Sequence, residues 1–299
     1  ITIEEGHARL LQTGPRKISP FTVPRLMVNA CAGNVSIKFD LKGANTATAT
    51  ACATGGHSIG SAFYLIQRGS ADVMFAGGSE AAISHLCIGS FAAMKALSTR
   101  NDAPEKASRP FDRDRNGIVA SEGGALYVLE RRDDALARGA RIVAELVGWH
   151  VNSDGTDFVL PDSAGQEACM RGALRHAELA PEAIDVINTH ATSTPSGDEI
   201  ECRAVRAVFG DSPDVRVNNT KSFIGHAMGA AGALELAGNL PSFTDGLVHP
   251  TINVENLDPE CELSGLVLDT PARPARIDHV LNMSFGMLGI NSAVVVARP

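Results

Sequence analysis

Residues 45–62 read NTATATACATGGHSIGSA, and this stretch joins a strand-like run to a helix-like run. Thr and Ala alternate over residues 46–51 without a charge, which predicts a buried β-strand. In the segment that follows, Ile59, Phe63 and Ile66 recur at helical spacing, which predicts a helix. Cys52 therefore lies at a strand-to-helix junction, at the head of the predicted helix.

The position of Cys52 allows two interpretations. Free cysteine is among the most buried residue types, so a structural role in the core is the simpler one. A thiol at a helix N-terminus instead faces the positive end of the helix dipole and unpaired N–H groups, which lower its pKa. The small neighbours Ala51, Ala53 and Gly55 leave room for a substrate. The local residues leave both a nucleophile and a core cysteine open.

Outward from this junction, strand-like and helix-like segments alternate along the chain, which predicts an α/β architecture with largely buried sheets. The predicted strands cover residues 46–51, 72–77, 125–129, 142–151, 184–190, 215–219 and 266–269, the helices cover 55–69, 165–179, 197–210 and 225–240, and a hairpin covers 279–297. A soft boundary near residue 141 divides the chain into predicted units of residues 1–140 and 141–299.

Composition excludes several classes of protein. Of the 299 residues, 44% are hydrophobic and 20% are charged, which is typical of globular proteins, and no apolar run is long enough to cross a bilayer. The net charge of −8 argues against a general nucleic-acid binder. The six cysteines form no CxxC pair, so we expect reduced thiols and a cytoplasmic location. The nine histidines show no zinc-binding spacing, so no metal site is predicted.

Three further stretches carry polar groups in suggestive places. In INTHATSTPSGDE (187–199), His190 ends a predicted strand and a hydroxyl-rich loop follows, which is either a site for chemistry or a capping loop. Residues 218–236 carry Lys221 and His226 before a small-residue helix whose glycine spacing fits no nucleotide-binding motif. DRDRNG (112–117) imitates a calcium loop, but Gly123 stands where the closing carboxylate belongs, so we expect a salt-bridged turn.

Six motifs occur in an order that is specific as a set. They are TATACATGGHSIG (48–60), RPFDRDRNGIV (109–119), NTHATSTPSGD (188–198), TKSFIGHAMGAAGALE (220–235), HPTINVENLDPE (249–260) and SFGMLGIN (284–291). Together with TGPRKISPF (13–21), they closely resemble the beta-ketoacyl-acyl-carrier-protein synthases, the type II elongating condensing enzymes. The resemblance covers essentially the whole chain.

The resemblance implies a thiolase fold, in which two similar halves form a five-layer αβαβα arrangement, and a homodimer. The first half, residues 1–140, would carry the nucleophile, and the second half, residues 141–299, both catalytic histidines. The opening strand–helix units of the family have no counterpart in this sequence, so the first half is expected to be incomplete at its start. We expect residues 1–299 alone to be poorly soluble or inactive for this reason.

The resemblance also implies the site residues. The family's catalytic and binding positions map onto Cys52, His190 and His226 as the catalytic set, Lys221 with Glu235 as the supporting pair, Phe285 as the gate beside the oxyanion hole, and Thr192 and Thr194 as the pantetheine-binding hydroxyls. The backbone N–H groups of Cys52 and Phe285 are expected to form the oxyanion hole.

Some positions separate this chain from its relatives. Thiolases carry a second catalytic cysteine that residues 284–291 lack, and priming synthases carry Asn where this chain has His226. Ala191 replaces the glycine that usually follows the first histidine. Met287, Leu288 and Ile290 replace a more glycine-rich gating loop, which puts acyl-chain length and gate mobility in question.

The activity implied is a decarboxylating condensation of an acyl-acyl carrier protein with malonyl-acyl carrier protein in fatty-acid elongation, without metal or organic cofactor. The acyl- and malonyl-loaded carrier is the expected partner, and Lys95 and Arg100 are either its docking patch or an ordinary solvated face. Two alternatives remain. The chain is a truncated, non-catalytic structural or heterodimeric partner, or it is a polyketide-type ketosynthase.

Overall fold

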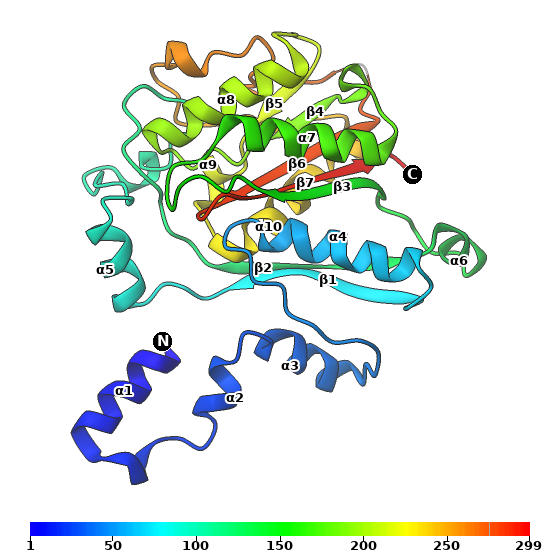
Figure 1. Cartoon of the computed structure of the whole chain (residues 1–299). Helices are drawn as coiled ribbons and strands as arrows, with labels where there is room; N and C mark the ends of the chain where they lie inside the picture. The colour runs from blue at the N-terminus through cyan, green and yellow to red at the C-terminus, as the bar shows by residue number, and fades with distance from the viewer. Residues whose placement is uncertain (275) are drawn as a thin grey trace.

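The computed structural model describes residues 1–274 and 276–299. Helices and sheets alternate in layers (Figure 1): α7 (Ser163–Ala177) and α8 (Pro195–Phe209) cover one face of a large sheet, and α4 (Thr54–Gln67) and α10 (Ala231–Asn239) lie between this sheet and a small one. Helices α1 (Thr2–Thr13), α2 (Thr22–Leu26) and α3 (Ala30–Phe39) lie beyond the small sheet. The layer order is the one expected from the sequence.

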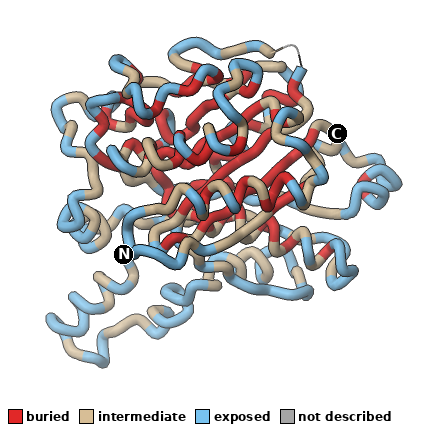
Figure 2. Tube along the Cα trace, turned by 45° about the horizontal axis from the view of Figure 1, so that its top comes forward, coloured by how far each residue is buried: buried red, intermediate tan, exposed pale blue. Residues whose placement is uncertain are grey.

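The large sheet has the strand order β3-β7-β6-β4-β5. Its strands are β3 (Glu145–Ser153), β4 (Val186–Asn188), β5 (Arg216–Asn218), β6 (His279–Gly286) and β7 (Ile290–Ala297). Strands β6 and β7 form the predicted hairpin, and β4 runs parallel to both β5 and β6. The apolar runs in β6 and β7 are buried almost throughout, because helices cover both faces (Figure 2).

The small sheet pairs β1 (Val73–Glu80) with β2 (Gly123–Glu130) in antiparallel register. Its strands were predicted to be buried, and that prediction was wrong for one face. Helix α4 covers the inner face, whereas Leu126 and Val128 on the outer face are more than half exposed. Phe39 of α3 stacks on Phe75 at a ring-centroid distance of 6.0 Å and shields only part of that face.

The N-terminal helices α1, α2 and α3 contain no buried residue, and many of their apolar side chains face solvent (Figure 2). Besides the Phe39–Phe75 stacking, these helices contact the rest of the chain through Glu4, whose carboxylate accepts the Ser84 hydroxyl and the Leu86 N–H at the start of α5. The remaining elements are short: α5 (His85–Ala93), α6 (Arg132–Ala137), α9 (Lys221–Ile224), α11 (Ser242–Asp245) and the 3-10 turns at Pro15–Lys17, Pro104–Lys106, Pro181–Ala183, Met228–Ala230 and Pro259–Cys261.

Three predicted elements differ from the structure. Residues 46–51 form no strand, because no neighbouring strand pairs with them among the described residues and only a Thr50–Cys52 bridge forms. Residues 266–269 make isolated bridges through Leu266 and Leu268 rather than a strand. The helix predicted from residue 225 begins at Met228 as a 3-10 turn that leads into α10.

The other predicted helices and strands are confirmed within a few residues of their bounds. The small sheet precedes the predicted boundary near residue 141 and every strand of the large sheet follows it. Across residues 1–274 and 276–299, no helix combines the length and apolar character that a membrane span requires.

Candidate active site

Cys52 lies in a tight turn just before α4. Ala51 adopts a left-handed conformation with φ of 48°, which costs a residue other than glycine about 1–3 kcal/mol. The Thr54 hydroxyl holds the turn, since it donates to the Ala51 carbonyl at 2.7 Å and accepts the Thr50 N–H at 2.9 Å. Gly286 at the end of β6 packs against this turn, and a Cβ there would lie 3.1 Å from the Thr50 carbonyl. The turn presents the sulfur at the end of the large sheet.

His226 reaches Cys52 from the loop after α9. Its backbone N–H donates to the Val119 carbonyl at 2.7 Å, and its carbonyl accepts the Ser121 N–H at 3.0 Å. Gly225 makes this approach possible, because it has φ of 70° and a Cβ would lie 2.7 Å from the same Val119 carbonyl. The Nε2 atom of His226 then lies 3.0 Å from the Cys52 sulfur. Backbone pairing with a distant segment thus sets the position of the imidazole.

His190 enters from the end of β4. Both carboxylate oxygens of Glu201 on α8 accept backbone N–H groups there, from His190 at 2.7 Å and from Ala191 at 2.6 Å. The Asn219 amide donates to the Ala191 carbonyl at 2.9 Å. The His190 and His226 rings meet nearly perpendicular, with centroids 5.3 Å apart. The structure therefore brings together the three predicted catalytic residues.

Both imidazoles are neutral at pH 7. Burial holds the pKa of His226 well below its usual value, and the nearby charge of Lys221 lowers it further. Burial also holds the pKa of His190 well below its usual value, and the charge of Lys221 lowers it further. Lys221 itself is buried and paired with Glu235 on α10, at an Nζ–Oε1 distance of 2.5 Å. The predicted supporting pair therefore forms, and its cation favours uncharged histidines.

Thr192 and Thr194 place their hydroxyls side by side, 3.1 Å apart and half-buried, in the loop that follows His190. Arg115 holds this loop, because its guanidinium donates to the Thr194 carbonyl at 3.1 Å and pairs with Asp258 at 2.6 Å. Asp198 accepts the backbone N–H of the intervening Ser193 at 3.1 Å. The stretch DRDRNG is thus the salt-bridged turn that was predicted, and it supports the threonine loop.

One predicted position has to be corrected. Phe285 is buried in β6 and packs on the His190 ring at 6.0 Å, so its backbone lies within a strand. The backbone N–H groups that lower the pKa of the Cys52 thiol are those of Met287 and Cys52 itself. Met287 comes two residues after Phe285, just past Gly286 at the end of β6.

The pKa of Cys52 is not lowered at the helix start, contrary to one of the two interpretations of its position. Burial of the thiol raises the pKa of Cys52 to about 11, although the residue as a whole is partly exposed. The charge of Lys221 and the N–H of Met287 offset this only in part. At rest the site therefore holds a neutral thiol beside neutral imidazoles.

Sequence reasoning missed Glu201, whose burial raises its pKa to about 8 against the two N–H groups that lower it. Asp198 is also fully buried, and burial raises its pKa to about 6. The signal was the acidic stretch GDEIE directly after the hydroxyl-rich loop, which looks like an ordinary helix start. Asn219 was missed as well, because an amide that bridges two loops leaves no pattern in the sequence.

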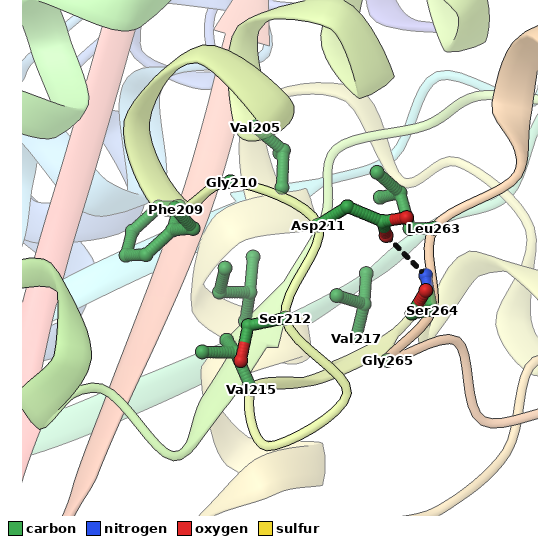
Figure 3. Close-up of a pocket in the computed structure, with 11 residues that line it drawn as sticks. Val205, Phe209, Gly210, Asp211, Ser212, Val215, Val217, Leu263, Ser264 and Gly265 are labelled. Carbon is green, nitrogen blue, oxygen red and sulfur yellow. Dashed lines mark hydrogen bonds between the residues drawn. The ribbon is translucent and has the colours of Figure 1, made fainter.

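A small hollow lies between the end of α8 and β5, lined by Phe209, Asp211 and Gly265 among others (Figure 3). The Asp211 carboxylate accepts the Ser264 N–H at 2.8 Å across it. Its volume of about 10 Å³ admits roughly one water molecule, and it shares no residue with the Cys52 cluster. It is a packing defect rather than a substrate site.

A thiol pKa near 11 predicts how Cys52 reacts with iodoacetamide as the pH changes. Because the thiolate is the reactive form, its alkylation rate should rise about tenfold per pH unit between pH 7 and pH 9.5. Peptide mass spectrometry measures this rate, with the exposed Cys31 in the same digest and Cys52→Ala as controls. A rate that is already constant at pH 7 would show that the helix start and Lys221 outweigh burial.

The comparisons with known proteins agree with one another. The family model "Beta-ketoacyl synthase, N-terminal domain" matches residues 2–135, and "Beta-ketoacyl synthase, C-terminal domain" matches residues 143–255. The chain is 47% identical over 299 residues to 3-oxoacyl-(acyl-carrier-protein) synthase 2 of Coxiella burnetii and 44% identical over 304 residues to that of Vibrio cholerae. Both alignments cover 99% of this chain and 72% of the relative.

Solved structures show the same fold. A type II polyketide ketosynthase in complex with its acyl carrier protein superposes with a TM-score of 0.95 at 32% identity, over 100% of this chain and 75% of that one. A beta-ketoacyl synthase from Burkholderia phymatum superposes with a TM-score of 0.94 at 35% identity, over 100% and 72%. The chain has the thiolase fold and belongs to the beta-ketoacyl synthase family of condensing enzymes.

Proposed function

We propose that this chain catalyses the decarboxylating condensation of an acyl-acyl carrier protein with malonyl-acyl carrier protein, giving 3-oxoacyl-acyl carrier protein in fatty-acid elongation. The observation that carries the proposal is the cluster in which the Cys52 thiol lies 3.0 Å from the His226 imidazole, with the His190 ring beside it. The relatives named 3-oxoacyl-(acyl-carrier-protein) synthase 2, at 41–47% identity, support this substrate class.

The first step is acyl transfer. The Cys52 sulfur attacks the thioester carbonyl of the acyl carrier, and the N–H groups of Met287 and Cys52 stabilise the oxyanion that develops. The pantetheine thiol departs with the proton that the Cys52 thiol gives up. The product is an acyl thioester on Cys52, which has no charge and suits the buried site.

The second step is decarboxylation and carbon–carbon bond formation. His190 and His226, both neutral, donate N–H groups to the thioester oxygen of the malonyl group. Loss of CO2 leaves an enolate at that oxygen, and its carbon attacks the Cys52 thioester. Release of the 3-oxoacyl chain and uptake of one proton restore the thiol, and the departure of CO2 drives the step without an organic cofactor.

The other predicted residues position this chemistry. Burial is the main reason that the imidazoles stay unprotonated, and the charge of Lys221, which Glu235 pairs with, adds to this effect. The adjacent hydroxyls of Thr192 and Thr194 hold the pantetheine arm, on a loop fixed by Arg115. Phe285, the expected gate, packs on the His190 ring and limits its orientation.

Three further parts of the proposal concern organisation. The chain divides into residues 1–140 with the nucleophile and residues 141–299 with both histidines, a division that the separate sheets support. It works as a homodimer, which the exposed apolar side chains on α1 to α3 and on the β1–β2 sheet support. It acts in the cytoplasm, in keeping with its six free cysteines.

The two steps can be separated by mutation. His226→Ala should lower malonyl decarboxylation by about 10²–10³-fold through loss of one oxyanion donor, while acyl transfer to Cys52 persists. Cys52→Gln should abolish acyl transfer and retain decarboxylation, because the amide resembles an acylated thiol. Released CO2 and intact-protein mass measure the two steps, with Cys31→Gln as the matched cysteine control.

Loss of acyl transfer in a folded His226→Ala protein would contradict this division of roles. The outcome also tests the strongest alternative, in which the chain is a non-catalytic structural or heterodimeric partner. One observation favours that alternative, because the β1–β2 sheet leaves Leu126 and Val128 exposed. A chain that is folded yet performs neither step would support it.

The carrier protein is the proposed partner, and the polyketide neighbour solved with its acyl carrier protein supports this. Carriers that are acidic would be repelled by a chain of net charge −8, so a local basic patch is needed. Lys95 is exposed at a left-handed turn after α5, and Arg100 is half-buried a few residues later. We propose these two residues as the patch.

Reversing both charges in Lys95→Glu/Arg100→Glu should raise the apparent KM for carrier-bound substrate and leave the KM for a short pantetheine thioester unchanged. The reason is that only the carrier-bound substrate uses the patch. Arg16→Glu/Lys17→Glu on the exposed turn after α1 changes the net charge equally and is the control. Equal effects of the two double variants, or of one variant on both substrates, would contradict the patch.

A further inference from the structure

The Cys52 cluster has the composition of a metal-binding site. The Cys52 sulfur and one ring nitrogen from each of His190 and His226 all lie within 4.8 Å of one another. No two of these residues are close in sequence, so the cluster forms no metal-binding spacing motif. The sequence therefore predicted no metal site. The fold creates the set of donors by joining the turn before α4 to two loops at the end of the large sheet.

The donors suit a borderline-soft divalent cation. One thiolate and two imidazoles with an open fourth position resemble the ligands of Zn²⁺ sites that bind water or substrate. Bond lengths of about 2.0–2.3 Å place tetrahedral donors roughly 3.3–3.6 Å apart. The pair at 3.0 Å must therefore open by about half an ångström, and the widest pair, at most 4.8 Å apart, must close by at most about 1.5 Å.

We propose that Cys52, His190 and His226 form a reversible inhibitory site for Zn²⁺ or a similar transition-metal ion. The ion replaces the thiol proton, which passes to solvent, and forms one bond to sulfur and one to each imidazole. No oxidation is involved. The bound ion occupies the proposed nucleophile and both proposed N–H donors at once, so it excludes acyl and malonyl thioesters alike.

Two features make this site weaker than a structural zinc site. The Nδ1 atoms of His190 and His226 are buried and have no hydrogen-bond partner among the described residues. Metal-bound histidines usually donate the second N–H to a carboxylate or carbonyl, and loss of such a partner weakens binding by about 10–100-fold. The buried Lys221 cation also opposes a dication, although Glu235 neutralises much of its charge. We therefore expect micromolar binding that EDTA reverses.

Binding is tested without reference to activity, whereas inhibition rests on the proposed function. Micromolar ZnCl₂ should slow alkylation of Cys52 in metal-free protein at least tenfold, and EDTA should restore it. The exposed Cys31 in the same digest should be unaffected. His190→Ala and His226→Ala should each remove most of the protection, and His7→Ala, an exposed histidine on α1, should not. Co²⁺ added to the unmutated protein should give a thiolate-to-metal charge-transfer band in the near ultraviolet.

Absence of both the protection and the cobalt band in the unmutated protein would overturn the proposal, even if a histidine variant fails to fold. Protection that both histidine variants retain would overturn it as well, since sulfur alone would then bind the ion. Protection together with loss of condensation supports both proposals. Protection of a chain that has no condensing activity with metal removed confirms the metal site and contradicts the proposed function.

Discussion

The contact between the Cys52 sulfur and His226 Nε2 at 3.0 Å is the interaction on which the site depends, because it joins two segments that lie far apart in the sequence. One is the strained turn before α4, and the other is the loop that Gly225 allows to approach Val119. Both segments meet at the end of the large sheet, where the β6–β7 hairpin adds the Met287 N–H. A change that moves either segment separates the thiol from the imidazole.

Desolvation determines the protonation states of Cys52, His190 and His226. It raises the pKa of the thiol to about 11 and holds both imidazoles unprotonated, so the resting site carries no charge on its three reactive groups. The charges it does contain are fixed in pairs or by hydrogen bonds, as Lys221 with Glu235 shows. Buried ion pairs of this kind add little net stability, but removing one partner is strongly destabilising. The Lys221–Glu235 pair acts electrostatically here, because the lysine charge favours neutral His190 and His226.

Much of the fold could be predicted because its signals are local. The spacing of Ile59 and Ile66 predicts α4, and the apolar runs on either side of Gly289 predict the closing hairpin. The Thr–Ala run at 46–51 has a strand's pattern but pairs with no strand in the described part of the chain, and pairing is not local. The exposed face of β1 and β2 was missed for the same reason, because alternation does not show what covers a strand.

The site residues were inferred from the resemblance of the ordered motifs to a known family, and that resemblance does not describe the environment of each side chain. Burial of the Cys52 thiol depends on the tertiary structure around it, so its raised pKa could not be predicted from the helix start. Glu201 and Asn219 act by hydrogen bonds to the backbone beside His190, which any acidic or amide residue could make in a suitable fold. The shift from Phe285 to Met287 reflects the geometry of a hairpin turn that only coordinates reveal.

The central claim is that one thiol among six carries the acyl group between two carrier-bound substrates. The most direct measurement is intact-protein mass spectrometry with peptide mapping, on protein mixed first with an acyl-loaded carrier and then with a malonyl-loaded one. The account predicts a single acyl adduct on Cys52 that disappears as 3-oxoacyl carrier forms. An adduct on another residue, or one on Cys52 that persists while product forms, would contradict it.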